Sequence, residues 1–420
     1  MRIAYVVGHY PLASETFIAR EIEALTARGA SVGVFRVYEP RHERWLARAE
    51  DGYRGDEEPR WLRGLRAPKG GLAAWLMTRS SEMVGALVRR PLFTLQWSAR
   101  LLASVHREGR KALRAIRYLP AAEELIQVLR RERVTQIHAH FAGIPSTVAW
   151  VAAAEVGVPF SFSVHARDAF VEPQFVAEKA RAADRVFVCN SAAAERLAAM
   201  VGPADRPKVA LVPHGVPLSR YPLRAGPPAG PPLILGVGRL VEKKGFIHLV
   251  RAIARLKQAG IEARCCILGE GPERPYLHRE IAAAGLRDTI AHTGWLPEEE
   301  VLLAYARARV LAVPSVVARD GDRDGLPNVA LEAAAIGLPI VATSVGGIGD
   351  LVRDGETGLV AREGDAEDLA EKILAVLKDP EGAMARARRA REEVEARFDQ
   401  EQCIRRLLAL LGASASPGGG

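Results

Sequence analysis

The stretch Leu233-Ile-Leu-Gly-Val-Gly-Arg-Leu-Val-Glu-Lys-Lys-Gly-Phe246 passes from a short apolar run through a glycine-containing turn into a helical pattern. Strand, turn and helix form the repeating unit of parallel α/β folds. A dinucleotide-binding fingerprint starting at Gly236 would need Gly or Ala at position 241, which is Val241, so that fingerprint is absent. Instead Arg239 and Lys244 stand at the strand end and the helix start, where both can reach one diphosphate. The alternative is a solvated basic turn.

The same alternation of strands and helices extends over nearly the whole chain and predicts two parallel sheets covered by helices. In the first half, strands are expected at 3–7, 31–37, 136–139, 160–164, 185–189 and 209–212. In the second half, they are expected at 233–237, 263–268, 290–293, 310–313, 339–342 and 358–360. Residues 217–232 include six prolines and two glycines. Neither residue extends a helix or a central strand, so this segment is expected to link two domains.

The length of 420 residues also favours two domains, because it exceeds what one hydrophobic core usually organises. We expect an α/β N-terminal domain over 1–220, with a basic helical insertion at about 60–120, and an α/β C-terminal domain over 221–397. A helix over 398–412 is expected to pack back on the N-terminal domain, followed by a disordered tail over 413–420. The carboxyl ends of both sheets would face one cleft, where ligands of doubly wound folds bind.

Composition excludes several other classes of protein. Hydrophobic residues at 49% and charged residues at 26% are typical of globular proteins. The apolar run Ile3–Val7 is too short for an export signal, and the longest apolar stretch, 148–164, falls short of a membrane span. We therefore expect a cytoplasmic chain. Buried free thiols, without paired metal-ligand spacing, are expected at Cys189, Cys265, Cys266 and Cys403.

A second motif, Asp324-Gly-Leu-Pro-Asn-Val-Ala-Leu-Glu332, places two carboxylates eight residues apart around a predicted helix start. Free backbone amides at a helix N-terminus suit phosphate oxygens, while both carboxylates can accept hydrogen bonds from hydroxyl groups. A capping aspartate followed by a buried glutamate is also a common structural pattern. Taken alone, the motif leaves the two interpretations equally open.

Histidines mark the end of strands in the first half of the chain. His165 directly follows a strand, which places it at the ligand-binding edge of the sheet. His138 and His140 share one face of another strand and could form a metal site with His165. No acidic ligand cluster accompanies them, so we expect no metal. Glu15 is expected near the cleft as an acceptor contact.

Together with Gly269-Glu-Gly-Pro272 and Thr293-Gly-Trp-Leu-Pro297, these motifs resemble glycosyltransferase family 4. Members of that family have the GT-B fold, in which two Rossmann-like doubly wound domains face a central cleft. The resemblance covers nearly the full chain and is specific because separate motifs occur in the family's order. Similarity to the bacterial subgroup that builds colanic acid and other exopolysaccharides is carried by Pro11-Leu-Ala-Ser-Glu-Thr-Phe-Ile18, Ile137-His-Ala-His-Phe141 and Phe162-Ser-Val-His-Ala-Arg-Asp168.

The resemblance implies roles for the matching residues. Arg239 and Lys244 would neutralise the donor diphosphate, Glu332 would bind the ribose, and His165 would lie over the donor sugar. Most relatives have glutamate at the position of Asp324, which leaves the sugar identity open. The residues implied in catalysis are His165, Arg239, Lys244, Asp324 and Glu332. Four of these residues, Arg239, Lys244, Asp324 and Glu332, are also expected to bind the donor. The other expected donor-binding residues are Gly8, Gly238, Glu270, Gly294, Trp295, Leu296, Gly325, Leu326, Asn328 and Val329. The acceptor contacts are expected to be Glu15, His165 and Arg167.

The family implies retention of anomeric configuration without a metal, with basic side chains in place of a cation. We therefore expect a hexosyltransferase that uses a UDP- or GDP-linked sugar and a growing, lipid-linked polysaccharide. No cofactor and no nucleic acid are expected. Two alternatives stay open. An epimerase of the same fold would consume the donor without an acceptor, and a noncatalytic nucleotide-sugar-binding subunit would transfer nothing.

Residues 60–120 hold thirteen Lys or Arg against two acids, and three of the six tryptophans. On one continuous helix, basic and apolar side chains would separate into two faces. The basic face would hold Arg100, Arg107, Lys111 and Arg114, and the apolar face Leu102, Val105, Leu113 and Ile116. With interfacial Trp61, Trp75 and Trp97, this pattern predicts peripheral attachment to anionic lipid on the inner face of the plasma membrane. The alternative is that the apolar face packs on the N-terminal sheet.

Overall fold

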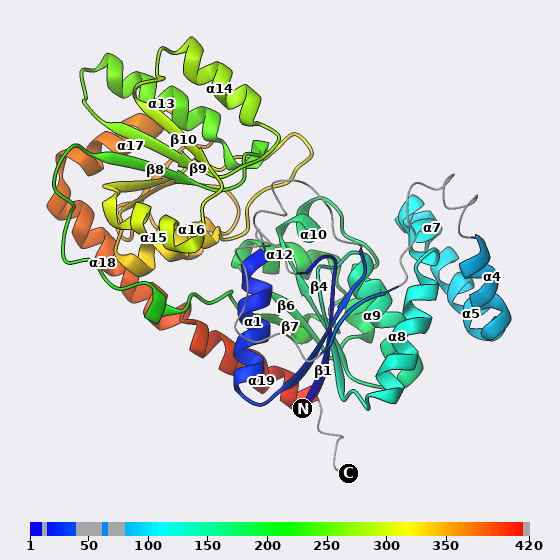
Figure 1. The fold of residues 1–420 in the computed structure, drawn as a ribbon. Helices are drawn as coiled ribbons and strands as arrows, with labels where there is room; N and C mark the ends of the chain where they lie inside the picture. Colours follow the sequence, from blue (N-terminus) through cyan, green and yellow to red (C-terminus); the bar gives the residue numbers. More distant parts are fainter. Residues whose placement is uncertain (11–14, 39–60, 66–79, 415–420) are drawn as a thin grey trace.

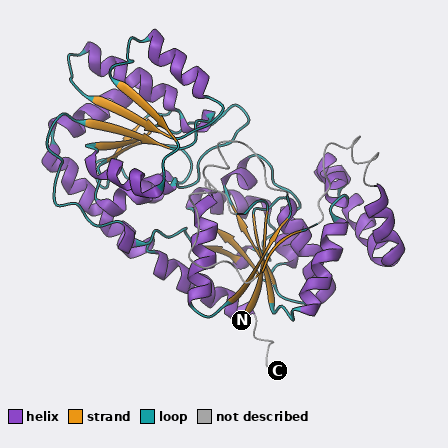
Figure 2. Ribbon diagram, viewed as in Figure 1, coloured by secondary structure: helices purple, strands orange, loops and turns teal. Residues whose placement is uncertain are grey.

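The computed structural model describes residues 1–10, 15–38, 61–65 and 80–414. They form two α/β domains, with the C-terminal domain at the upper left of Figure 1 and the N-terminal domain at the lower right. Each domain has a parallel sheet with helices on both faces (Figure 2). The predicted fold class of two Rossmann-like domains is confirmed.

The N-terminal sheet has seven strands in the order β3-β2-β1-β4-β5-β6-β7. Alternate residues of β1 enter different cores: Ala4 and Val6 pack on one face of the sheet, Ile3 and Tyr5 on the other. The strands are β1 (Arg2–Val7), β2 (Ser31–Arg36), β3 (Trp61–Gly64), β4 (Gln136–His140), β5 (Phe160–Val164), β6 (Arg185–Val188) and β7 (Val209–Leu211). The helices are α1 (Thr16–Ala27), α4 (Ser80–Arg89), α5 (Pro91–Leu102), α6 (Val105–Glu108), α7 (Arg110–Ile116), α8 (Leu119–Arg131), α9 (Ile144–Val156), α10 (Ala166–Phe170), α11 (Val176–Ala182) and α12 (Ser191–Met200).

The C-terminal sheet has six strands in the order β10-β9-β8-β11-β12-β13. The central strand β8 is likewise shared, since Ile234 and Leu235 enter cores on opposite faces. The strands are β8 (Leu233–Val237), β9 (Arg264–Leu268), β10 (Ile290–Gly294), β11 (Val310–Val313), β12 (Ile340–Thr343) and β13 (Leu359–Ala361). The helices are α13 (Phe246–Gln258), α14 (Arg274–Ala283), α15 (Glu298–Arg307), α16 (Asn328–Ile336), α17 (Ala366–Lys378) and α18 (Pro380–Arg397).

The chain crosses between the domains twice. Residues 217–232 lead from β7 to β8, and after α18 the chain returns to α19 (Gln400–Ser414), which lies beside α1 (Figure 1). The two crossings run together, because Val216 forms a β-bridge with Asp399. Of the predicted tail, residues 413 and 414 belong to α19, and 415–420 lie outside the described residues.

The basic segment differs from the predicted helical insertion. Residues 61–64 form the edge strand β3, which pairs with β2. The continuous helix expected to carry Arg100 to Ile116 is wrong, because the chain bends after α5 and again at Gly109, whose φ is 54°. The helices α4, α5 and α7 instead lie at the far right of Figure 1, away from the C-terminal domain. Along the described stretches of the chain, no helix is long and apolar enough to cross a membrane.

Candidate active site

A cleft of about 1070 Å³ lies between the two domains. Loops that follow β4, β5 and β6 line it on the N-terminal side, together with the start of α1. Loops that follow β8, β9, β10 and β11 line it on the C-terminal side. The carboxyl ends of both sheets therefore border one cavity, as expected for doubly wound domains.

Lys244 lies at the base of the cleft because of the turn that follows β8. Gly245 has a φ of 62°, and a Cβ at this position would overlap the carbonyl oxygen of Pro314, so the turn requires glycine. Lys244 Nζ lies 2.9 Å from Asp324 Oδ2. Arg239 is exposed in the same cleft and forms no ion pair with any residue that the structure describes. The two predicted diphosphate ligands thus differ, because Lys244 is already paired with Asp324 whereas Arg239 is available to a phosphate.

Asp324 is buried and held by three side chains. Its Oδ2 atom accepts hydrogen bonds from Lys244 Nζ and from Ser315 Oγ at 2.7 Å, and Lys243 Nζ lies 3.9 Å from Oδ1. Burial alone would raise the pKa of Asp324, but the ammonium groups of Lys244 and Lys243 outweigh it and hold the pKa below its usual value. Asp324 is therefore an anion in the folded protein, and its oxygen atoms already have partners.

Glu332 faces an arginine from the opposite domain. Tyr305 donates a hydrogen bond from Oη to Glu332 Oε2 at 3.0 Å, and Arg20 Nη1 lies 3.6 Å from Glu332 Oε1. Arg20 also pairs with Glu298 at 3.1 Å. Sequence reasoning missed Arg20, although its position among Ile18, Ala19 and Ile22 on the buried side of α1 is a signal, because a buried charge needs a partner.

Two predicted donor residues do not line the cleft. Gly8 lies beneath the ring of Tyr38. Gly294 has a φ of 78° and makes room for Glu270, since a Cβ on Gly294 would lie 2.8 Å from Glu270 Oε1. All other predicted site residues line the cleft, namely Glu15, His165, Arg167, Gly238, Arg239, Lys244, Glu270, Trp295, Leu296, Asp324, Gly325, Leu326, Asn328, Val329 and Glu332.

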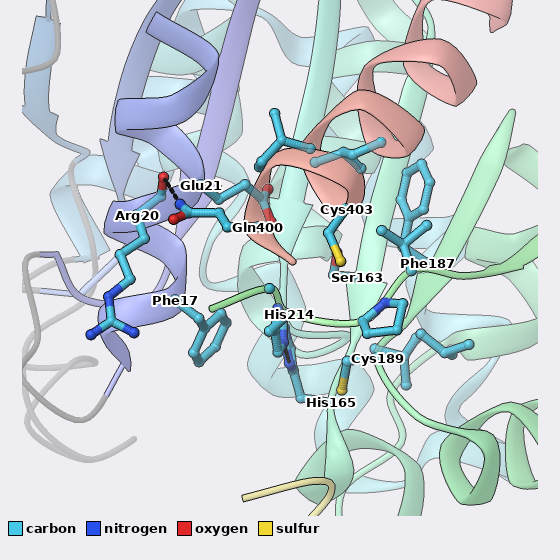
Figure 3. Close-up of a pocket in the computed structure, with 17 residues that line it drawn as sticks. Phe17, Arg20, Glu21, Ser163, His165, Phe187, Cys189, His214, Gln400 and Cys403 are labelled. Carbon is cyan, nitrogen blue, oxygen red and sulfur yellow. Dashed lines mark hydrogen bonds between the residues drawn. The ribbon is translucent and has the colours of Figure 1, made fainter. Parts of the chain in front are cut away.

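His165 stands at the start of α10, beside His214 (Figure 3), and forms a row of imidazoles with His214 and His140. Its Nδ1 atom lies 3.4 Å from His214 Nε2, and its Nε2 atom lies 3.3 Å from His140 Nδ1. His140 Nε2 in turn lies 3.2 Å from Glu21 Oε1. Burial, together with the neighbouring His214, lowers the pKa of His165 well below its usual value. His165 is therefore neutral at physiological pH and offers one lone pair and one N–H.

His138 does not belong to that row. Its two ring nitrogens lie 2.9 Å from Ser161 Oγ and 3.1 Å from Ser163 Oγ, so both have partners in the core of the sheet. Burial lowers the pKa of His138 to about 3. Its observed role is that of a hydrogen-bonded core residue.

The two further residues predicted to bind the acceptor differ in state. Burial raises the pKa of Glu15 to about 7, although the charge of Arg239 partly opposes this shift. Arg167 bridges the domains, because its Nη1 atom lies 3.4 Å from a carboxylate oxygen of Asp320 and of Asp322. Arg167 thus forms part of the domain interface, while Glu15 is a titratable group inside the cleft.

Two facing Rossmann-like domains around one cleft form the GT-B architecture, in which ligands bind at the carboxyl ends of the strands. The family model described as "Glycosyl transferases group 1" matches residues 223–393, and the model described as "Glycosyltransferase Family 4" matches residues 70–220. The putative colanic acid biosynthesis glycosyltransferase WcaL of Escherichia coli is 30% identical over 98% of this chain and 100% of its own length. The chain belongs to glycosyltransferase family 4.

Another relative and two solved structures are also similar to this chain. The amylovoran biosynthesis glycosyltransferase AmsK of Erwinia amylovora is 34% identical over 51% of this chain and 53% of its own length. A glycosyltransferase from Rickettsia africae superposes with a TM-score of 0.70, at 14% identity, over 99% of both chains. HepE from Anabaena in complex with UDP gives a TM-score of 0.68, at 16% identity, over 98% of this chain and 100% of that chain. These structural likenesses establish the fold.

Proposed function

We propose that this chain is a retaining, metal-independent hexosyltransferase that moves a sugar from a UDP- or GDP-linked donor to a growing, lipid-linked polysaccharide. One observation carries the proposal: the cleft holds the exposed cation Arg239 and the start of α16 on one wall and His165 on the other. The names of the relatives from Escherichia coli and Erwinia amylovora support a polysaccharide acceptor. The UDP bound by HepE makes uridine nucleotides the first donors to test.

The donor diphosphate is proposed to bind between Arg239, Lys244 and the first amides of α16. Arg239 is the available cation, while Lys244 would share its charge between Asp324 and a phosphate oxygen. The free amides at the start of a nine-residue helix add positive potential at the same place. These groups would stabilise the negative charge that develops on the leaving diphosphate.

The transfer step is proposed to take place on one face of the sugar. The bond from the anomeric carbon to the diphosphate oxygen breaks, and a bond from the same carbon to the acceptor oxygen forms. The acceptor proton passes to the leaving phosphate oxygen, so atoms and charges balance without a covalent enzyme intermediate. The neutral His165 would hydrogen-bond a sugar hydroxyl and orient it.

The membrane proposal keeps three residues of the expected apolar face, Leu102, Val105 and Leu113, but it does not rest on the expected tryptophan anchors or on one continuous helix. Trp97 is 4% exposed and donates a hydrogen bond to Glu155, so it is not an interfacial anchor. Trp75 and the side chain of Trp61 lie outside the described part of the chain. Arg100 lies over the rings of Trp97 and Trp150. Exposed apolar side chains instead gather on α4, α5 and the helices that follow them. They are Val84, Leu87, Val88, Leu92, Leu95, Leu102, Val105 and Leu113. We propose that this apolar surface attaches the protein to the cytoplasmic face of the membrane.

A nucleotide-sugar panel tests the proposed reaction. Thermal shift should identify one UDP- or GDP-linked hexose that stabilises the chain, since a ligand that binds only the folded state raises its melting temperature. That donor should then yield free nucleoside diphosphate and an extended glycan in equal amounts when acceptor is added. Conversion of the donor to another sugar without acceptor would instead indicate an epimerase. Tight binding without any turnover, on a full acceptor panel, would indicate a binding subunit.

A further inference from the structure

A second arrangement of chemistry-bearing side chains lies beside the cleft. One ligand atom each from His165, Cys189 and His214 lies within 4.8 Å of the others. His165 Nδ1 and His214 Nε2 are 3.4 Å apart. Two nitrogen ligands of a tetrahedral zinc ion, each about 2.05 Å from the metal, are separated by about 3.4 Å. The two imidazoles therefore already have the spacing of a metal chelate.

A chain of hydrogen bonds from Glu21 through His140 determines which ring nitrogen of His165 carries the proton. Glu21 Oε1 accepts from Tyr5 Oη at 2.7 Å, and hydrogen bonds from His140 and Tyr5 help lower the pKa of Glu21 to about 2 against the opposing effect of burial. As an anion, Glu21 can only accept, so His140 donates its Nε2–H to Glu21 and turns the lone pair of Nδ1 toward His165. His165 then donates from Nε2, which leaves its Nδ1 lone pair facing His214 and the backbone N–H of Asp168 at the start of α10.

The same arrangement occurs around known metal sites, where a metal-ligating imidazole donates its other N–H to a hydrogen-bonded partner. Here that partner is His140, which is itself held by the carboxylate of Glu21. In the protein without an ion, His214 can donate its Nε2–H to His165. The other tautomer of His214 turns both lone pairs toward one point. Both imidazoles are neutral at physiological pH, which is the form that binds metals, because burial lowers the pKa of each.

Cys189 supplies a soft ligand at the end of β6. Its sulfur accepts a hydrogen bond from Asn190 Nδ2 at 3.3 Å, a contact that favours the thiolate. Burial raises the pKa of Cys189 to about 11, so the group is a thiol until a cation displaces its proton. Two imidazoles and one thiolate form a set typical of zinc, and ions that prefer oxygen ligands alone are disfavoured.

Access to the three ligands is open on the cleft side. All three line a small cavity of about 30 Å³, drawn in Figure 3, and all three also line the large cleft between the domains. A space of that size holds one or two water molecules. An ion bound here would thus have three protein ligands and a free position for water, with a path to bulk solvent.

We propose that His165, Cys189 and His214 bind a thiophilic divalent cation such as Zn²⁺, with its remaining coordination position open to the cleft. The ion is not part of the transfer step. It occupies the Nδ1 lone pair of His165, which would otherwise be available to a sugar hydroxyl, and it draws His214 and Cys189 toward one centre. Bound cation therefore inhibits transfer, and its removal restores activity.

Cobalt titration of the full-length chain tests binding without reference to activity. Tetrahedral Co²⁺ bound to a thiolate has a sulfur-to-metal charge-transfer absorption, so we expect this band to appear with one Co²⁺ per chain and to vanish when Zn²⁺ is added. Cys189→Ser should abolish the band. Cys266→Ser, which changes a half-buried free thiol outside the cleft, should leave it intact. His214→Gln should weaken Co²⁺ binding, and Glu21→Gln should do so by about 10- to 100-fold.

Inhibition gives a second, separate readout. Micromolar Zn²⁺ should slow sugar transfer by the wild-type chain, and EDTA should reverse the effect, whereas Cys189→Ser should need about tenfold more Zn²⁺ relative to its own uninhibited rate. A thiolate band that is absent in the wild type, or unchanged in Cys189→Ser, would overturn the site. Equal Zn²⁺ sensitivity of the wild type and Cys189→Ser would overturn its proposed effect on transfer. None of the binding results depends on the sugar donor or the acceptor.

Discussion

At the scale of single residues, the cleft holds its charges in pairs. Lys244 is paired with Asp324, and Glu332 is contacted by Tyr305 and by Arg20 from the opposite domain. A donor must therefore compete with existing contacts, which keeps buried charges from being unpaired when the cleft is open. Arg239 differs from these residues, since it is exposed and forms no ion pair with the residues described. We expect it to meet the donor first.

Removal of either Lys244 or Glu332 should abolish turnover without unfolding the chain. Each supplies a polar contact rather than core volume, and loss of one charge-assisted contact costs on the order of 2 to 4 kcal/mol in the transition state. Steady-state rates of Lys244→Ala and Glu332→Ala should fall accordingly, while the exposed Lys378→Ala serves as the matched control. Near wild-type rates in both variants would refute the donor-site assignment.

The pH dependence should report on Glu15. Because burial raises its pKa to about 7, Glu15 is protonated below that pH and becomes a carboxylate above it. Only the ionised form of Glu15 offers both carboxyl oxygens to a hydroxyl group of the sugar acceptor, because the protonated form uses one oxygen as a hydrogen-bond donor. The acceptor kcat/KM should therefore rise with pH through about 7, and Glu15→Gln should flatten this rise. An unchanged acidic limb in Glu15→Gln would assign the titration to another group.

At the scale of elements, the sequence predicts what is buried on both faces better than what lies at an edge. Strands such as β1, β8 and β11 are continuous apolar runs because helices cover both sides, and they form where expected. β3 was missed because an edge strand with Trp61 and Arg63 lacks that pattern. The break at Gly109 was missed because helical periodicity continues through it. Likewise the motifs predicted Arg239 and Glu332, but not Arg20, whose partner Glu332 is distant in the sequence.

Membrane attachment should depend on the exposed apolar side chains of α4 and α5. Val88 and Leu92 are 75% and 73% exposed, and each buried apolar side chain contributes roughly 1.5 to 3 kcal/mol to insertion in an apolar environment. In liposome sedimentation, Val88→Gln with Leu92→Gln should release the protein from anionic vesicles, and added salt should weaken binding. Leu303→Gln, an exposed leucine of the C-terminal domain, is the control. A wild-type chain that ignores anionic vesicles at low salt would make this surface a contact for something else.

At the scale of the whole molecule, polar contacts hold the domains together while separate cores stabilise each one. Arg20 with Glu298, Arg167 with Asp320, and Ser191 with Asp350 connect the two sides of the cleft. Polar contacts between domains of one chain resemble those of transient interfaces. The N-terminal core is completed from the far end of the chain by α19. The C-terminal helix thus ties the end of the chain to the N-terminal domain, while polar contacts connect the two sides of the cleft.

Loss of packing in α19 should destabilise the N-terminal domain. Leu407 is 3% exposed and packs in the same core as residues of β1 and α1, so Leu407→Ala leaves a cavity. The free energy of unfolding, measured by chemical denaturation, should fall by about 2 to 5 kcal/mol. Leu303→Ala, at a site that is 56% exposed, should change it by less than about 0.5 kcal/mol. Equal effects of the two changes would show that α19 does not contribute to that core in solution.

The central claim is that side chains of this cleft, rather than a metal, stabilise the diphosphate that leaves during sugar transfer. The most direct measurement is the rate of hexose transfer from the nucleotide sugar identified in the panel, with excess EDTA and then with added Mg²⁺. The account predicts that nucleoside diphosphate and extended glycan appear at undiminished and equal rates in EDTA, because Arg239 and Lys244 supply the positive charge. A complete loss of transfer in EDTA that Mg²⁺ restores would contradict it.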